Sequence, residues 1–188
     1  MGRWEPNASA RLRAAALELY VERGFEQTTV AEIAQRAGLT ARTFFRYFAD
    51  KREVLFDGSA TFQQHLVSAL DSAPDSASPM QAVSAALDAA AAMLGERREF
   101  SRQRQSVIAA NAELRERELI KMASVSTALA DALRRRGVAD ADARLAAEAG
   151  VGVLRVAFER WVTHSGDREL SQVMRESLAQ LKALTADR

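Results

Sequence analysis

The chain has 188 residues, 48% of them hydrophobic and 27% charged, with a formal net charge of +1. This composition is typical of a compact helical protein and excludes a disordered chain. The lack of cysteine excludes disulfides and thiolate metal sites, and no apolar run approaches the roughly 20 residues that cross a bilayer. We therefore expect a cytoplasmic protein with no membrane partner.

The basic charge gathers near the N-terminus. Residues 1–52 contain nine Arg and Lys against six Asp and Glu, whereas residues 53–188 contain 17 against 19. A positive excess attracts polyanions such as nucleic acid. The excess is modest, so it supports a nucleic-acid partner without establishing one.

The first predicted helix covers residues 10–23, with Asn7 or Ser9 as its cap and Gly24 as its end. Its apolar side, which starts at Leu12, would pack behind the elements that follow. Basic residues around its start are predicted to lie beside bound nucleic acid and to contact phosphates: Arg3, Arg11 and Arg13.

Residues 28–51 have the pattern of a helix-turn-helix. Thr29, with Glu three positions later, fits the capping box that starts a helix, and Gly38 provides the left-handed residue that ends it. Thr40 caps a second helix over residues 41–48. Two short helices joined by a tight turn containing Gly form a motif that reads DNA.

The second of these helices has one face suited to DNA. Successive residues lie about 100° apart, so Phe44 and Phe48 stack on one side. The opposite side carries Arg42 and Arg46 and has no acidic residue before Asp50. Arg can bond the edge of guanine, Thr can contact a base or a thymine methyl, and Tyr can bond a phosphate.

We predict that this helix and the capping residues contact a double-stranded DNA operator. The alternative is an ordinary solvated basic helix in a bundle, which explains the arginines but neither the capped helix nor the Gly turn before them. The predicted contacts are Thr29, Thr40, Arg42, Thr43, Phe45, Arg46, Tyr47 and Lys51.

This segment resembles the DNA-binding head of the tetracycline-repressor (TetR) family of bacterial transcription regulators, over a bit more than a quarter of the chain. The resemblance implies a regulator that binds a palindromic operator as a dimer. Phe45 stands where the family usually has Tyr, which implies the loss of a hydroxyl contact. Arg42 stands where many members have a small residue, which implies a base contact of its own. The matching positions are Arg23-Gly24-Phe25, Thr28-Thr29-Val30, Ile33-Ala34, Ala37-Gly38-Leu39, Thr43-Phe44-Phe45, Tyr47-Phe48 and Lys51.

A fourth helix is predicted to begin at Asp50 and to reach about Leu70. Asp50 and Glu53 fit a capping box, and Lys51 in the first turn is predicted to hold a phosphate together with the exposed N–H groups. The alternative for Lys51 is a plain solvent-exposed lysine. Residues 71–78, rich in Ser and Asp, form the one clear linker.

Five more helices are predicted after the linker, over residues 79–94, 96–111, 111–136, 140–164 and 167–185. The predicted fold class is therefore all-α, with about nine helices and no convincing strand. We predict two domains: a three-helix DNA-binding head with the helix-turn-helix over residues 1–52, and a helical ligand-binding and dimerisation bundle over residues 53–188.

The last two helices are predicted to form a homodimer interface. Small residues on the first of them would let another helix approach closely, which would offset the roughly 1 kcal/mol that a Gly costs in a helix. The alternative is that both apolar stripes face the chain's own core. The two stripes are Ala146, Ala149, Gly150, Val153 and Ala157, and then Leu170, Val173, Met174, Leu178 and Leu181.

In the family that the head resembles, the remaining helices hold a small-molecule effector. The resemblance therefore implies a cavity for an unknown effector, and its binding would release the DNA. The alternative, favoured because every helical bundle needs such residues, is that these side chains are plain core. The candidate lining is Phe62, His65, Leu66, Leu87, Ala91, Leu94, Met122, Leu129, Leu154, Phe158 and Trp161.

No motif in the sequence predicts catalysis. Neither His65 nor His164 has a second His or an acid at metal-ligand spacing, and there is no nucleophile motif or phosphate loop. We expect no enzyme activity, no metal and no cofactor. A second hypothesis is a helical small-molecule-binding or adaptor protein that no longer reads DNA, although Arg42 and Thr43 argue against it.

Overall fold

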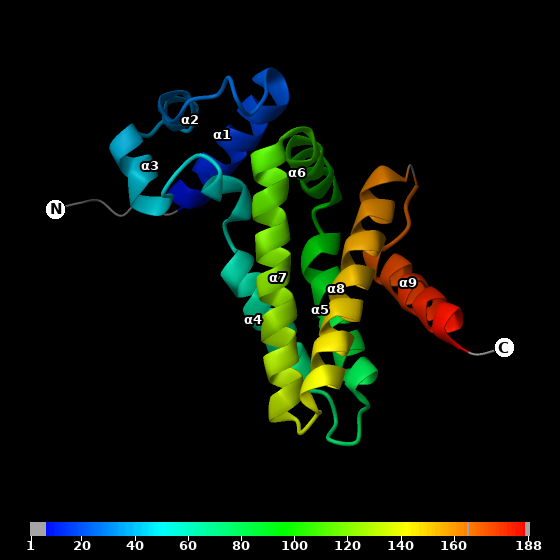
Figure 1. Ribbon diagram of the computed structural model, residues 1–188. Helices are drawn as coiled ribbons and strands as arrows, with labels where there is room; N and C mark the ends of the chain where they lie inside the picture. Colours follow the sequence, from blue (N-terminus) through cyan, green and yellow to red (C-terminus); the bar gives the residue numbers. More distant parts are fainter. Residues whose placement is uncertain (1–6, 165, 187–188) are drawn as a thin grey trace. The chain divides into compact units, whose positions relative to one another are not determined.

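The computed structural model describes residues 7–164 and 166–186, and within these ranges it is entirely helical (Figure 1). This confirms the predicted all-α class. None of the described helices is long and apolar enough to cross a membrane. The elements are α1 (Ala8–Arg23), α2 (Val30–Arg36), α3 (Ala41–Tyr47), the 3-10 turn η1 (Glu53–Phe56), α4 (Ser59–Asp71), α5 (Pro79–Gly95), α6 (Arg98–Ala110), α7 (Ala112–Arg135), α8 (Asp140–Thr163) and α9 (Leu170–Thr185).

The chain divides into two compact units. The head unit contains the residues up to Asp57 together with Gln103–Glu118, and the body unit contains Gly58–Arg102 together with Leu119 onward. The sequence had assigned residues 53–57 and 103–118 to the C-terminal domain. The functional division at residue 52 stays a prediction.

Polar contacts explain why the 103–118 segment groups with the head. The Arg104 guanidinium donates to the carbonyl of Leu55 at 2.8 Å and pairs with Glu118 at 3.0 Å. Arg117 forms an ion pair with Glu53. The contacts to Leu55 and Glu53 join residues 49 and 64 positions apart in sequence, so local patterns could not predict them.

Three helices supply the core around the helix-turn-helix. Leu12 and Leu19 of α1, Ile33 of α2 and Phe44 of α3 are almost completely buried. The ring of Phe48 lies 5.5 Å from that of Phe44, which confirms that the two aromatic side chains share the inner face. The opposite side of α3 is consequently left to solvent.

The predicted start of the fourth helix is wrong. Asp50 accepts hydrogen bonds from the backbone N–H groups of Arg52 and Glu53, at 2.8 and 3.1 Å, but only a single 3-10 turn follows. Gly58 then adopts a left-handed conformation with φ 86°, and α4 starts at Ser59. A left-handed residue interrupts the helical hydrogen-bond ladder, so one predicted helix becomes two elements.

In the body unit, α4, α8 and α9 pack against α5, which is rich in alanine. The small side chains allow close approach: a Cβ added to Gly150 of α8 would lie 2.5 Å from Cγ1 of Val83 on α5. The predicted small-residue stripe on α8 therefore faces the unit's own core.

The apolar stripe of α9 is also internal. Leu170, Val173, Met174 and Leu178 are buried in the body core, and Leu181 packs against its edge. Both stripes therefore face the chain's own core, which was the alternative to the predicted dimer interface.

Candidate DNA-reading surface

The turn between α2 and α3 is built by two threonine caps. The Thr29 hydroxyl accepts from the backbone N–H of Glu32 at 3.3 Å, while the Glu32 carboxylate accepts from the Thr29 N–H at 2.9 Å, which completes the predicted capping box. The hydrogen bonds from the backbone and side chain of Thr29 lower the pKa of Glu32. Thr40 caps α3 in the same way by accepting from the N–H of Thr43 at 3.1 Å.

Gly38 makes the turn possible. It has φ 65°, and a Cβ at this position would lie 2.9 Å from a guanidinium nitrogen of Arg11. That nitrogen donates to the carbonyl of Ala37 at 2.5 Å, at the end of α2. Arg11 therefore closes α2 and is not part of a free basic tail.

Arg13, a second residue of the predicted basic tail, also has a partner in the head unit. Arg13 forms an ion pair with Asp57 at 3.4 Å, within the head unit. Arg3 lies outside the described residues. The sequence pattern could not reveal the Asp57 partner because it lies 44 positions later.

The outer face of α3 presents cations and an aromatic ring. Arg42 and Arg46 are exposed, and Phe45 is 58% exposed, which is unusual for a phenyl ring. The Arg46 guanidinium lies 5.0 Å from the centre of the Tyr47 ring and donates to its hydroxyl at 3.3 Å. The Thr43 hydroxyl is 3.0 Å from that of Thr40. Of the five predicted contacts on α3, Arg42, Phe45 and Arg46 are therefore exposed, and Thr43 and Tyr47 are half-buried.

Two arginines near the helix-turn-helix, outside α3, are paired with acids. Arg36 of α2 contacts Glu22 at 2.9 Å and Glu18 at 3.3 Å on α1. Arg23 pairs with Glu32 at 3.0 Å. These two cations are locally neutralised, whereas no ion pair with a described acidic residue is found for Arg42 or Arg46 on α3.

Lys51 is placed differently from the other predicted contacts. Its ammonium donates to the carbonyls of Phe25, Glu26 and Thr28, at 2.8, 3.2 and 3.0 Å. These atoms belong to the loop between α1 and α2, so the side chain points into the head unit.

The candidate effector residues mostly lie together in the body core. Leu66, Leu87, Ala91, Leu129, Leu154 and Trp161 are buried there, and Phe62, Leu94, Met122 and Phe158 pack around them. His65 is the exception, because it is exposed with Nδ1 3.2 Å from the sulfur of Met93. Among the described residues, no group of three or more His, Cys, Asp or Glu could hold a metal.

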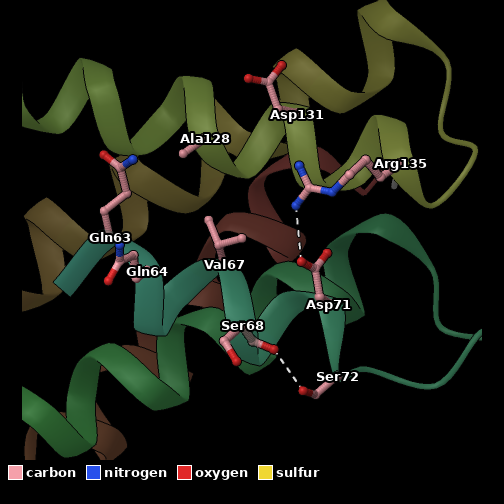
Figure 2. A pocket seen from close by; sticks show the side chains of 9 residues that line it. All are labelled: Gln63, Gln64, Val67, Ser68, Asp71, Ser72, Ala128, Asp131 and Arg135. Atoms are coloured by element: carbon pink, nitrogen blue, oxygen red, sulfur yellow. Dashed lines mark hydrogen bonds and ion pairs between the residues drawn. The ribbon is translucent and has the colours of Figure 1, made fainter. Parts of the chain in front are cut away.

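A polar groove of about 550 Å³ lies between α4 and α7 (Figure 2). Figure 2 shows Val67 between the two helices and Asp71 directed toward Arg135, with which it pairs at 3.0 Å. None of the predicted lining residues belongs to this groove. An apolar helical stripe does not indicate the walls of this groove, most of which are polar: Gln63, Gln64, Val67, Ser68, Asp71, Ser72, Ala128, Asp131 and Arg135.

Two family models match the chain. Residues 12–57, which include the helix-turn-helix, match the family described as bacterial regulatory proteins, tetR family. Residues 77–186, more than half of the chain, match the MftR C-terminal domain.

Two curated relatives support these matches. The HTH-type transcriptional regulator TcmR of Streptomyces glaucescens is 40% identical over 74 residues, which cover 39% of this chain but only 33% of that protein. The regulator MftR of Mycobacterium tuberculosis, whose description concerns mycofactocin biosynthesis, is 27% identical over 165 residues, covering 86% of this chain and 83% of that protein.

Solved structures show the same fold. The fatty acid degradation regulator FadR of Bacillus halodurans superposes with a TM-score of 0.70 at 19% identity, covering 99% of this chain and 100% of that one. FadR of Bacillus subtilis, solved in complex with stearoyl-CoA, superposes with a TM-score of 0.67 at 20% identity, covering 92% of this chain and 96% of that one. Together with the two family matches and the geometry of α2 and α3, this makes the chain a DNA-binding member of the TetR family of transcriptional regulators.

Proposed function

We propose that this regulator is a repressor in the cytoplasm that occupies a palindromic operator as a homodimer and is released by a small-molecule effector. The observation that carries the proposal is the exposed face of α3, whose arginines have no acidic partner in the part of the chain that the structure describes and which is held from behind by the buried rings of Phe44 and Phe48. A surface of this kind has the dimensions and the donors needed to enter a major groove.

Each side chain on this surface has a distinct proposed role. Arg42 bonds the edge of a guanine, Arg46 and Tyr47 bond a phosphate or a base edge, and Thr43 contacts a base. Phe45 contacts a thymine methyl, since its ring has no hydroxyl to donate. Thr29 and Thr40 stand at the starts of α2 and α3, where backbone N–H groups attract phosphates.

We propose that the dimer forms through the outward faces of α8 and α9. Leu145 and Val156 of α8 are 72% and 52% exposed, with the exposed Gly152 between them on the same side. Leu184 of α9 is 78% exposed. Twofold pairing of such faces would present two heads to half-sites about 34–36 Å apart.

The effector is proposed to bind among the apolar side chains of the body core, which must separate to admit it. The Bacillus subtilis and Thermus thermophilus FadR structures contain stearoyl-CoA and lauroyl-CoA. A long-chain acyl-CoA is therefore the first effector class to test. A coupling of about 1–3 kcal/mol between effector and DNA would change operator affinity by roughly 5- to 150-fold.

The decisive experiment is selection from random double-stranded oligonucleotides with the purified full chain. We expect enrichment of a palindromic sequence, and loss of that enrichment in an Arg42→Ala, Arg46→Ala double variant that keeps its thermal stability. Enrichment of no sequence at low ionic strength would instead favour the adaptor hypothesis. The selected duplex then serves to screen acyl-CoAs of increasing chain length for release.

A further inference from the structure

Building on the proposed reading of DNA by α3, we propose that Lys51 is a positioning residue that holds the helix-turn-helix together, and that it does not contact a phosphate. A lysine at the end of a DNA-reading helix is easily interpreted as a phosphate ligand. The geometry of the ammonium group points to a different role.

All the hydrogen-bonding capacity of the Lys51 ammonium is used inside the head unit. An ammonium group has three donors, and the carbonyls of Phe25, Glu26 and Thr28 lie 2.8, 3.2 and 3.0 Å from Nζ. The group also lies 4.4 Å from the centre of the Phe25 ring, within the range of a cation–π interaction. A phosphate would have to displace at least one of these partners.

The backbone of Lys51 is held from a second direction. The Tyr20 hydroxyl donates to the Lys51 carbonyl at 2.6 Å, and the Tyr20 ring meets the Phe25 ring edge-on at 5.2 Å. Burial and the nearby charge of Asp50 raise the pKa of Tyr20, so its hydroxyl remains a donor at all physiological pH values. α1, the loop that follows it and the segment after α3 are thus linked through one residue, by the carbonyl and the ammonium group of Lys51.

This link acts on both ends of the DNA-reading motif. The bonded loop leads directly into Thr29, which caps α2, and Lys51 follows the last residue of α3 by four positions. Loss of the link would let α3 change its orientation relative to α2. Contacts to base edges depend on that orientation, whereas general attraction to phosphates does not.

Chemical acetylation of the wild-type protein tests the placement directly. The chain has three lysines, Lys51, Lys121 and Lys182, so mass spectrometry can follow each one separately. We expect Lys51 to react much more slowly than the exposed Lys182 without DNA, and to gain no further protection from the selected operator. Rapid reaction without DNA followed by protection with DNA would overturn the proposal.

Two substitutions separate positioning from phosphate binding. Lys51→Met removes the charge, and Lys51→Arg keeps a charge that serves a phosphate but cannot meet the same three carbonyls. We expect both variants to lose about fivefold or more in affinity for the selected operator, the effect of one weakened base contact. Affinity for unrelated DNA should stay within about twofold, because it depends on phosphates.

The salt dependence supplies the contrasting outcome. A lost phosphate contact would lower the slope of log affinity against log salt by about 0.9 per protomer, or about 1.8 for the dimer, in Lys51→Met and leave Lys51→Arg near wild type. That result would overturn the proposal. Lys182→Met is the matched control, and all variants are compared well below their unfolding midpoints. If the wild type selects no operator, the proposed function fails. Acetylation of the DNA-free protein still decides whether the Lys51 ammonium is held by the loop carbonyls.

Discussion

Base recognition by individual side chains can be tested first at Arg42, which is exposed on α3. We expect Arg42→Ala to weaken binding to the selected operator by about 1–3 kcal/mol and to relax the preference at one base pair. Affinities for the operator and its single-base variants, measured at one salt concentration, check this. Arg102→Ala on α6, whose side chain is 63% exposed and lies outside both proposed surfaces, serves as the control. An equal loss on every sequence would identify Arg42 as a phosphate contact.

Phe45 offers a test of apolar recognition. If its ring covers a thymine methyl, replacing that thymine by uracil should weaken wild-type binding about fourfold, since burial of one methylene contributes about 0.8 kcal/mol. The Phe45→Ala variant should be insensitive to the same replacement. Scanning each thymine of the operator with both proteins gives the measurement. Equal sensitivity of the two proteins at every thymine would exclude the contact.

Two glycines of α8 form a matched pair for stability. Gly150→Ala places a Cβ 2.5 Å from Val83, whereas a Cβ at Gly152 meets no atom within 4 Å. We expect Gly150→Ala to lower the free energy of unfolding by about 1–3 kcal/mol through overpacking. Gly152→Ala, measured in a monomeric Leu145→Glu, Val156→Glu background so that no partner helix meets it, should raise the free energy of unfolding by about 1 kcal/mol through helix propensity. Urea unfolding measures both, and a stable Gly150→Ala protein would contradict the close packing of α5 and α8.

Individual helices depend on their caps, and α2, with seven residues, is a suitable test case. Thr29→Ala removes the hydroxyl that accepts from Glu32, and we expect a loss of about 1 kcal/mol in stability. Hydrogen exchange should show the loss in the amides of α2. Thr127→Ala, an exposed site in the middle of α7, is the control and should change stability much less. Unchanged exchange in α2 would mean that tertiary packing alone holds this helix.

Local sequence patterns are sufficient to predict the boundaries of some helices but not of others. The boundaries of α2 and α3 follow from caps within three residues, so the sequence predicts them well. The start of α4 cannot be predicted in this way, because the capping pattern at Asp50 supports only one 3-10 turn before the left-handed Gly58. A cap pattern predicts where a helix can begin but not how far it extends.

Assembly of the whole molecule can be tested on α8. We expect Leu145→Glu combined with Val156→Glu to convert a dimer into a monomer, because charged residues would then face each other across the twofold axis. Operator affinity should fall in parallel. Sedimentation gives the mass, and the equally exposed Leu119→Glu of α7 is the control. A double variant that keeps the dimer mass would place the interface elsewhere.

The sequence by itself determined the helical class, the helix-turn-helix with its threonine caps, and the separation of buried phenyl rings from exposed arginines on α3. All three depend on residues within one or two helical turns. Tertiary structure alone decided which partners the charged and small residues find: Lys51 with the loop after α1, Arg11 with the end of α2, and Gly150 with Val83. The physical reason is that a donor, a charge or a missing Cβ acquires its role from atoms distant in sequence, and helical periodicity carries no information about those atoms.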